Sequence, residues 1–367
     1  MPTLFDPVTA GDLHLPNRIV MAPLTRNRAP DALPTPLMAE YYTQRASAGL
    51  LITEATAISH QAQGYSDVPG LYGTEQLDGW KRVTQSVHEA GGRIVVQLWH
   101  VGRISHTDLQ PDGGKPVAPS AITAKTKTVL IKGGVPVFVD TSEPRALDAG
   151  EMPGIVHTFQ AAARNAVETA GFDGVEIHAA NGYLLDQFMK DGSNKREDDY
   201  GGSIENRARL TLEITRAIAD AIGGGKVGIR LSPVTPANDA HDSNPQPLFD
   251  YVVRHLATLN LAYVHIIEGA TGGPRKIDDR PFDYKALQHA YREAGGKGAW
   301  MVNNGYDEAL AENAVADGDD LVAFGRPYIA NPDLVERLRQ HAPLAESNKA
   351  TWYGGGAKGY TDYPTLE

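Results

Sequence analysis

The segment Gly174–Phe188, GVEIHAANGYLLDQF, decides how the rest of the chain is interpreted. Its first half predicts a buried strand that ends at His178, and its second half predicts a loop that enters an apolar turn. His178, Asn181 and Tyr183 therefore follow closely on the strand's C-terminal end. Ligands bind at that edge in proteins with parallel strands, because the loops there vary while the strands hold their bases rigid. We expect these three side chains to belong to one ligand site.

Segments of the same kind recur along the chain. They are short, rich in Val and Ile, and apolar on both faces, which is typical of a parallel sheet covered by helices. The candidate strands are Arg18–Leu24, Leu50–Ala55, Arg93–Trp99, Gly174–Ala179, Lys226–Leu231, Ala262–Glu268, Ala299–Asn303 and Leu321–Phe324.

Amphipathic segments alternate with these strands. Apolar residues at helical spacing predict helices over Gly154–Ala170, Ile204–Ile222 and Phe249–Leu259, with Ser203 as the N-cap of the second. Eight strands alternating with helices predict an α/β fold, the (β/α)8 TIM barrel, and the main alternative is a doubly wound open sheet. The count of eight, and the polar residues after nearly every strand, favour the barrel. We expect residues 1–367 to form a single barrel domain.

Residues 101–150 interrupt the alternation after the third strand. They include Pro111–Gly114, then Val117–Ser120, then a β-rich stretch over Thr128–Val139. Long connections in compact domains are usually functional or disordered, and the Val, Ile and Thr content favours order here. We expect an insertion that contains a β-hairpin and caps the mouth of the barrel.

Composition excludes several classes of protein. The chain has 367 residues and a formal net charge of −11, which disfavours nucleic acid and anionic membranes as partners. The absence of cysteine excludes disulfides, thiolate zinc sites, iron–sulfur clusters and cysteine nucleophiles. The start shows no secretory signal, and no run approaches the ~18 apolar residues of a membrane span. We expect a soluble, cytoplasmic protein.

The residues at the strand ends make several classes of enzyme less well supported. Only Glu54 and Glu268 lie near strand ends, so the paired carboxylates of a glycosidase are weakly supported. His178 has no neighbouring cluster of metal ligands, and no candidate strand ends in the Lys of a Schiff-base enzyme. We expect no metal. A pocket rich in donors and poor in charge suits a large planar ligand with carbonyls, ring nitrogens and a phosphate.

The loops after strands seven and eight are a candidate binding site for that phosphate. In barrels of this type these loops commonly bind phosphate through backbone N–H groups and a helix N-terminus. Gly305 lets the backbone approach closely, and Arg326 can add charge-assisted hydrogen bonds.

Taken together, the motifs resemble the old yellow enzyme family of flavin-dependent ene-reductases, in its classical bacterial branch of N-ethylmaleimide, pentaerythritol tetranitrate and xenobiotic reductases. The resemblance runs from Leu4 to Leu366. The segments that carry it are Leu4-Phe5, Asn17–Arg26 (NRIVMAPLTR), Gln97–Arg103 (QLWHVGR), His178–Phe188, Asn194–Arg207 (NKREDDYGGSIENR), Ala323–Arg326 (AFGR) and Tyr353–Gly356 (YGGG).

This resemblance implies a non-covalent FMN on the C-terminal face of the barrel, reduced by NADPH or NADH. It implies hydride transfer from the flavin N5 to the β-carbon of an activated alkene, such as an enone, maleimide or nitroalkene, with possible activity on nitrate esters or nitro compounds. His178 and Asn181 would bind the substrate's carbonyl or nitro oxygen, and Tyr183 would protonate the α-carbon. These donors would stabilise the charge that develops in the transition state.

The resemblance also assigns the surrounding residues. Thr25 would hydrogen-bond the flavin O4, Gln97 would contact the pyrimidine edge, and Arg230 would lie near N1 and O2. Ala57 would offer a backbone contact. The implied cofactor-binding set is Pro23, Leu24, Thr25, Ala57, Gln97, Arg230, Asn304, Gly305, Phe324, Gly325 and Arg326, and the implied substrate-pocket walls are Tyr65, Trp99 and Tyr353.

Two positions distinguish this chain within the family. Asn181 stands where some relatives carry a second His, and Thr25 stands where another branch has Cys. The run Asn194–Arg207 is interpreted as scaffold. The expected partners are activated alkenes and NAD(P)H, in a monomer or homodimer.

Three alternatives remain open at this point. They are a quinone or nitro-compound reductase, a flavoprotein that binds phenolic ligands or stores FMN, and a barrel hydrolase without flavin.

Overall fold

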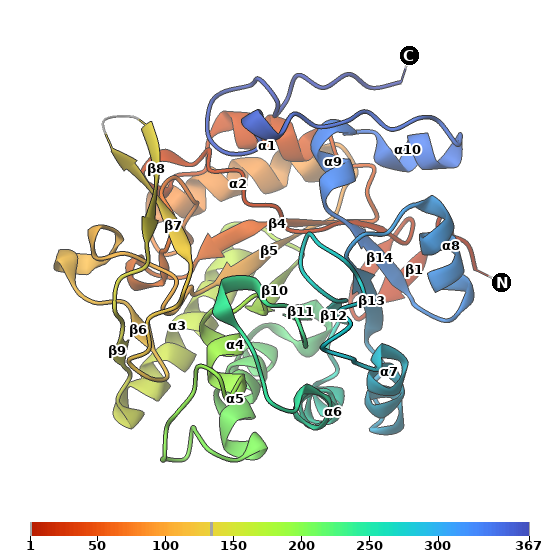
Figure 1. Ribbon diagram of the computed structural model, residues 1–367. Helices are drawn as coiled ribbons and strands as arrows, with labels where there is room; N and C mark the ends of the chain where they lie inside the picture. Colours follow the sequence, from red (N-terminus) through yellow and green to blue (C-terminus); the bar gives the residue numbers. More distant parts are fainter. Residues whose placement is uncertain (1, 133–134, 367) are drawn as a thin grey trace.

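A computed structural model describes residues 2–132 and 135–366, and in these residues eight parallel strands close into a barrel. The strands follow one another around the barrel in chain order, and the last pairs with the first (Figure 1). They are β3 (Ile19–Met21), β4 (Leu50–Ala57), β5 (Ile94–Trp99), β10 (Gly174–Ala179), β11 (Val227–Leu231), β12 (Tyr263–Ile267), β13 (Ala299–Asn303) and β14 (Leu321–Phe324). The (β/α)8 prediction is confirmed, and the open-sheet alternative is wrong.

Three predicted strands have the observed bounds, and the others differ at their ends. β3 ends at Met21, before Pro23, whose nitrogen cannot donate to a neighbouring strand. β4 extends to Ala57, because that residue pairs with both Trp99 of β5 and Gly70 of the following loop.

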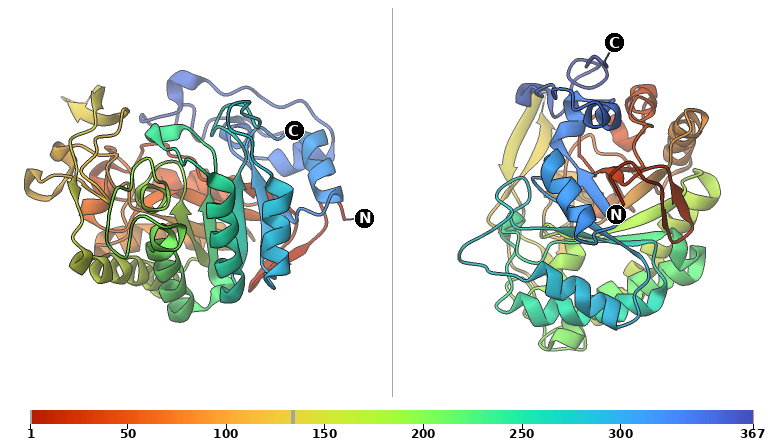
Figure 2. Two further views of the ribbon diagram at one scale, coloured as in Figure 1. Left: turned by 60° about the horizontal axis from the view of Figure 1, so that its bottom comes forward. Right: turned by 90° about the vertical axis from the view of Figure 1, so that its right-hand side faces the viewer.

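Helices surround the strands on the outside (Figures 1 and 2). Their apolar faces pack against the outward side chains of the barrel, such as Val175 and Ile177. They are α1 (Pro36–Thr43), α2 (Thr74–Glu89), α3 (Met152–Arg164), α4 (Leu184–Met189), α5 (Ile204–Ile222), α6 (Pro245–Leu256), α7 (Tyr284–Glu293), α8 (Glu308–Ala316), α9 (Arg326–Ala330) and α10 (Leu334–Arg339).

The predicted helices are present with small shifts. The α3 helix continues as a π-helical turn over Asn165–Thr169, and α5 has the predicted bounds, capped by the Ser203 hydroxyl. The α6 helix begins at Pro245, earlier than predicted, because proline suits the first turn of a helix.

The 101–150 insertion contains the predicted hairpin, formed by the antiparallel strands β7 (Lys127–Lys132) and β8 (Val135–Asp140). A short parallel pair, β6 (Val117–Ala118) and β9 (Arg145–Ala146), lies at its base. The hairpin binds the loop after β4, where the Ser66 N–H donates to the Val129 carbonyl over 3.0 Å and the Thr128 hydroxyl donates to the Gly64 carbonyl.

A second hairpin, β1 (Val8–Ala10) and β2 (Leu13–Leu15), was not predicted. Its buried residues Ala10, Leu13 and Leu15 join the cluster of side chains inside the barrel. The turn approaches Gly225 and Ala262, which precede β11 and β12, so this hairpin covers the N-terminal end of the barrel.

After α10 the chain runs back across the barrel, along the top of Figure 1. Arg26 and Arg28, in the loop after β3, donate to carbonyls of this segment, including those of Trp352 and Gly359. Among the described residues, no helix combines the length and the apolar character needed to cross a membrane.

Candidate functional site

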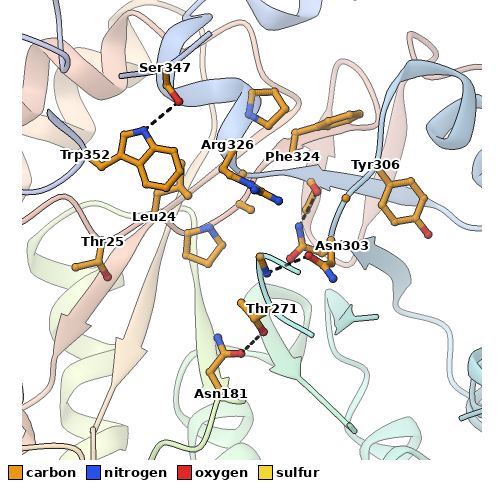
Figure 3. A pocket seen from close by; sticks show the side chains of 18 of the residues that line it. Leu24, Thr25, Asn181, Thr271, Asn303, Tyr306, Phe324, Arg326, Ser347 and Trp352 are labelled. Carbon is orange, nitrogen blue, oxygen red and sulfur yellow. Dashed lines mark hydrogen bonds between the residues drawn. The ribbon is translucent and has the colours of Figure 1, made fainter. Parts of the chain in front are cut away.

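A cavity of about 790 Å³ lies at the C-terminal ends of the barrel strands (Figure 3). That volume is in the range of sites that enclose a cofactor or a substrate. Its predicted lining residues are Pro23, Leu24, Thr25, Gln97, Trp99, His178, Asn181, Tyr183, Arg230, Asn304, Gly305, Phe324, Gly325 and Arg326. The closed barrel therefore brings together residues from most of the chain.

The floor of the cavity follows from strand alternation. Val95 packs inside the barrel, so Gln97 and Trp99, two and four residues later, face inward as well. On the neighbouring β10, the same alternation turns Glu176 and His178 inward. These side chains are held by rigid strands, and their positions do not depend on a loop.

A hydrogen-bonded network of buried side chains lies beneath this floor. The Gln97 Nε2 donates to one carboxylate oxygen of Glu176 over 2.7 Å, and the His265 Nδ1 lies 2.8 Å from the other. The amide nitrogen of Gln97 is engaged by Glu176, and within the described residues its carbonyl oxygen accepts no hydrogen bond. The site thus offers an acceptor here among many donors.

Arg230 supplies a buried positive charge to the site. Its guanidinium donates to the Asn303 Oδ1 over 2.7 Å, while its Nε is buried and finds no acceptor in the described part of the chain. Burial lowers the pKa of Arg230 to about 10, opposed by the charge of Glu176, so the group stays protonated at neutral pH. A buried cation with a spare donor suits a ligand that carries or develops negative charge.

His178 is a neutral hydrogen-bonding group. It is 3% exposed, and its Nδ1 is buried with no hydrogen-bond partner within residues 2–132 and 135–366. Burial, followed by the charge of Arg230, lowers the pKa of His178 well below its ordinary value. An imidazole held neutral near the cavity can bind a polar ligand without becoming charged first.

Asn181 is fixed at every polar group but one. Its backbone has φ +58°, a left-handed conformation that asparagine tolerates, and its N–H donates to the Ser232 Oγ. Its carbonyl accepts from the Asn238 Nδ2, and its Oδ1 accepts from the Thr271 hydroxyl over 2.6 Å. Figure 3 shows the amide nitrogen directed away from Thr271 into the cavity.

Tyr183 lies within an aromatic group with Trp99 and Tyr65. The Tyr183 and Tyr65 hydroxyls are 3.2 Å apart, and the Tyr65 ring stacks on Trp99 with centroids 5.4 Å apart. The Tyr183 ring meets Trp99 edge-on, and its centroid lies 5.0 Å from that of His178. Burial raises the pKa of Tyr183, so its hydroxyl keeps its proton at neutral pH.

Asn304 lines the cavity, but its side chain is already engaged. Its Nδ2 donates to the carbonyls of Glu268 and Ala270, and its Oδ1 accepts from the Gly272 N–H. These bonds hold the loop after β12. The predicted cofactor contact of Asn304 would therefore fall to its backbone.

Three predicted residues, Ala57, Tyr65 and Tyr353, are not among the residues that line the cavity. Both backbone polar groups of Ala57 are used, since its N–H donates to Pro69 and its carbonyl accepts from Leu71. Tyr353 is 61% exposed, and its neighbour Trp352 lines the cavity instead. Tyr65 also lies behind the wall, in contact with Trp99 and Tyr183.

The insertion contacts the site indirectly, through the loop that carries Tyr65. In the described chain the cavity is lined by other segments, while β7 binds residues on either side of Tyr65. The insertion thus supports the loop that carries Tyr65, and the expectation that residues 101–150 cap the mouth of the barrel stays a prediction.

Several residues that line the cavity could not be predicted, or were not predicted, from the sequence. Asn303 ends a predicted strand and could have been found by the same rule as His178. Thr271 lies in a long loop, and the C-terminal residues follow no strand, so no local pattern pointed to them. The missed lining residues include Thr271, Gly272, Asn303, Tyr306, Leu344, Glu346, Ser347, Lys349 and Trp352.

Comparison with known proteins agrees with this geometry. Residues 3–345 match the family described as NADH:flavin oxidoreductase / NADH oxidase. The chain is 44% identical to 12-oxophytodienoate reductase 1 of Oryza sativa subsp. japonica over 371 residues, covering 99% of this chain and 93% of the relative.

Solved structures give the same result. Morphinone reductase in complex with tetrahydroNAD superposes with a TM-score of 0.94 at 47% identity, covering 100% of this chain and 98% of that one. The old yellow enzyme homologue of Zymomonas mobilis has a TM-score of 0.93 at 42% identity and is covered completely, as is this chain. The chain therefore belongs to the NADH:flavin oxidoreductase / NADH oxidase family, the old yellow enzyme family of oxidoreductases.

Proposed function

We propose that this protein is an FMN-dependent ene-reductase that uses NADPH or NADH to reduce activated alkenes such as enones, maleimides and nitroalkenes. The observation that carries the proposal is the convergence of His178, Asn181 and Tyr183 on one cavity above a buried Arg230. Relatives named as oxophytodienoate and morphinone reductases support the class of reaction.

The residues present fit FMN. The buried Arg230 Nε lacks an acceptor among the described residues. It could therefore donate to a flavin ring, which gains negative charge when it is reduced. The free carbonyl of Gln97 suits an imide N–H, and Thr25 adds a hydroxyl. The phosphate would be held by Gly305, in the loop after β13, and by Gly325 and Arg326, at the start of α9.

FMN, when bound, supplies the hydride that is added to the substrate's β-carbon, after reduction by the nicotinamide. His178 and Asn181 donate hydrogen bonds to the substrate's oxygen, where negative charge develops as the alkene is reduced. Fixed donors aimed at that oxygen stabilise the transition state more than the ground state. The hydroxyl of Tyr183 gives its proton to the α-carbon.

The first test is an anaerobic titration of the purified protein with NADPH or NADH, followed by cyclohexenone, with the flavin absorbance recorded throughout. We expect bleaching and then recovery of the oxidised spectrum. Bleaching without recovery would contradict the alkene site. A protein that shows no flavin band after FMN is supplied would contradict the cofactor.

The role of Tyr183 is tested separately by Tyr183→Phe. We expect alkene reduction to slow by about 10²-fold, because the proton donor is lost, while quinone turnover changes little, since quinones need no proton on carbon. Tyr65→Phe is the matched control: it removes the neighbouring hydroxyl and keeps the donor. Equal loss on alkene and quinone would overturn this role of Tyr183.

A further inference from the structure

The loop after β12 forms a hydrogen bond with Asn181 through the side chain of Thr271. The Thr271 hydroxyl lies 2.6 Å from the Asn181 Oδ1 and also lines the cavity (Figure 3). Thr271 is exposed, so this contact is not a by-product of core packing. An exposed hydroxyl held against one atom of a site residue calls for a functional explanation.

The direction of this hydrogen bond follows from a third hydroxyl, that of Thr235. The Thr235 Oγ1 accepts from the N–H groups of Thr271 and Ala237, at 3.1 and 3.4 Å, so its lone pairs are engaged and its own proton is free to be given. It lies 3.2 Å from the Thr271 Oγ1 and donates to it. Thr271 accepts this hydrogen bond and donates its own to the Asn181 Oδ1.

This hydrogen bond determines the orientation of the Asn181 side-chain amide. An amide has a donor end and an acceptor end of nearly equal size, and a partner of fixed polarity decides which end faces the ligand. Because Thr271 donates, the carbonyl end is turned to the loop and the amide N–H groups face the cavity. A reversed amide would present an oxygen to the substrate's oxygen, which is repulsive.

The loop itself is held in place. Asn304 binds the carbonyls of Glu268 and Ala270 and the N–H of Gly272, on both sides of Thr271. Ser232 and Asn238 fix the backbone of Asn181 from the other side. Both partners of the contact are therefore preorganised.

We propose that Thr271, oriented by Thr235, is a positioning residue that sets the polarity of the Asn181 amide, so that its N–H groups face the substrate's oxygen. The inference rests on the proposed function, in which Asn181 binds that oxygen. It adds a determinant from a different loop, about 90 residues away in the sequence.

The test compares Thr271→Val, which keeps the shape and removes the hydroxyl, with Thr271→Ser, which keeps the hydroxyl. Binding of cyclohexenone to the oxidised, FMN-loaded protein is measured by the change in flavin absorbance. We expect Thr271→Val to weaken binding about tenfold, the size of one hydrogen bond, and Thr271→Ser to stay within about twofold of the wild type.

A double-mutant cycle with Asn181→Gly separates positioning from a general effect on the loop. Glycine accepts the left-handed φ of this position, so the backbone is kept. We expect Thr271→Val to have no further effect in the Asn181→Gly background, because the amide to be oriented is gone. An undiminished effect there would overturn the inference.

The outcomes distinguish the inference from the proposed function. Wild-type binding in Thr271→Val, together with weak binding in Asn181→Gly, would overturn the inference and leave the proposed function intact. Undiminished binding in Asn181→Gly, or no enone binding by the wild type, would overturn the assigned site. Because Thr271 is exposed, its variants are expected to fold, and their melting temperatures and FMN content check this.

Discussion

Glu54, on β4, has a carboxyl group with no exposed surface. It accepts hydrogen bonds from the Tyr42 hydroxyl and the Arg26 N–H, at 3.3 and 3.5 Å. Burial raises the pKa of Glu54 to about 7, although the hydrogen bond and the charge from Arg26 oppose it. The folded protein thus holds a proton on Glu54 up to near-neutral pH, while the unfolded chain releases it near 4.5.

The sign of the pH dependence follows from this difference. Between pH 4.5 and 7 the native state binds the proton more tightly, so this group makes the free energy of unfolding fall as pH rises. The loss reaches at most about 3 kcal/mol and levels off above pH 7. Below pH 4.5 both states are protonated, and the group contributes no pH dependence.

Glu54→Gln removes this titration. The free energy of unfolding of the variant, relative to that of the wild type, should rise by up to about 3 kcal/mol from pH 5 to pH 8. The reason is that only the wild type must bury a charge at the higher pH. Denaturant unfolding at both pH values measures it. A stability difference that stays constant with pH would contradict the assigned pKa.

At the scale of elements, α4 fixes the loop that carries the proposed catalytic residues. The buried Asp186 accepts from the Gly182 N–H over 2.8 Å, next to Tyr183. Lys190, also buried, donates to Asp186 and to the Ser232 carbonyl, each over 2.9 Å. The ion pair therefore joins the loop after β10 to the end of β11.

Lys190→Met tests this link. We expect a loss of about 3–5 kcal/mol in stability, because the Asp186 carboxylate is left buried without its cation. The loss should shrink at low pH, since burial already raises the pKa of Asp186 and protonation removes the unpaired charge. Thermal melts from pH 5 to pH 8 measure both effects.

The control is the neutral pair, Asp186→Asn with Lys190→Met, in which no charge is buried. It should recover much of the stability that Lys190→Met alone loses. If the two proteins melt alike at pH 8, the unpaired charge is not the cause.

At the scale of the whole molecule, the C-terminal segment completes the cavity and is fastened by aromatic packing. The Tyr360 ring is fully buried and stacks on Tyr41 with centroids 4.0 Å apart. The Arg28 guanidinium lies 4.4 Å from the same ring. Trp352, earlier in the segment, lines the cavity and donates to the Ser347 hydroxyl (Figure 3).

Tyr360→Ala should loosen this wall. We expect a loss of about 3–5 kcal/mol in stability, from removal of a large buried ring, together with weaker FMN binding because Trp352 and its neighbours lose their support. Melting temperature and the dissociation constant of FMN are the measurements.

Tyr360→Phe is the matched control, since the Tyr360 hydroxyl is buried and makes no hydrogen bond to any described residue. It should behave like the wild type or be slightly more stable. Full FMN affinity in Tyr360→Ala would show that the segment does not support the cofactor site.

The sequence by itself determined the barrel and much of its floor. The rule that ligands lie past strand ends predicted that His178, Asn181 and Tyr183 share one site, because a closed parallel barrel brings all its strand ends to one face. The family motifs supplied the expectation of a flavin cofactor and the proposed residue roles, which periodicity alone could not give.

Only the tertiary structure decided what surrounds that floor. Thr271, Trp352 and the engaged side chain of Asn304 depend on contacts between loops far apart in the sequence, which leave no local pattern. The same holds for Ala57, whose backbone N–H and carbonyl are hydrogen-bonded to Pro69 and Leu71. Local periodicity encodes strands and helices, whereas the positions of loops are set by hydrogen bonds and packing that form only once the barrel has closed.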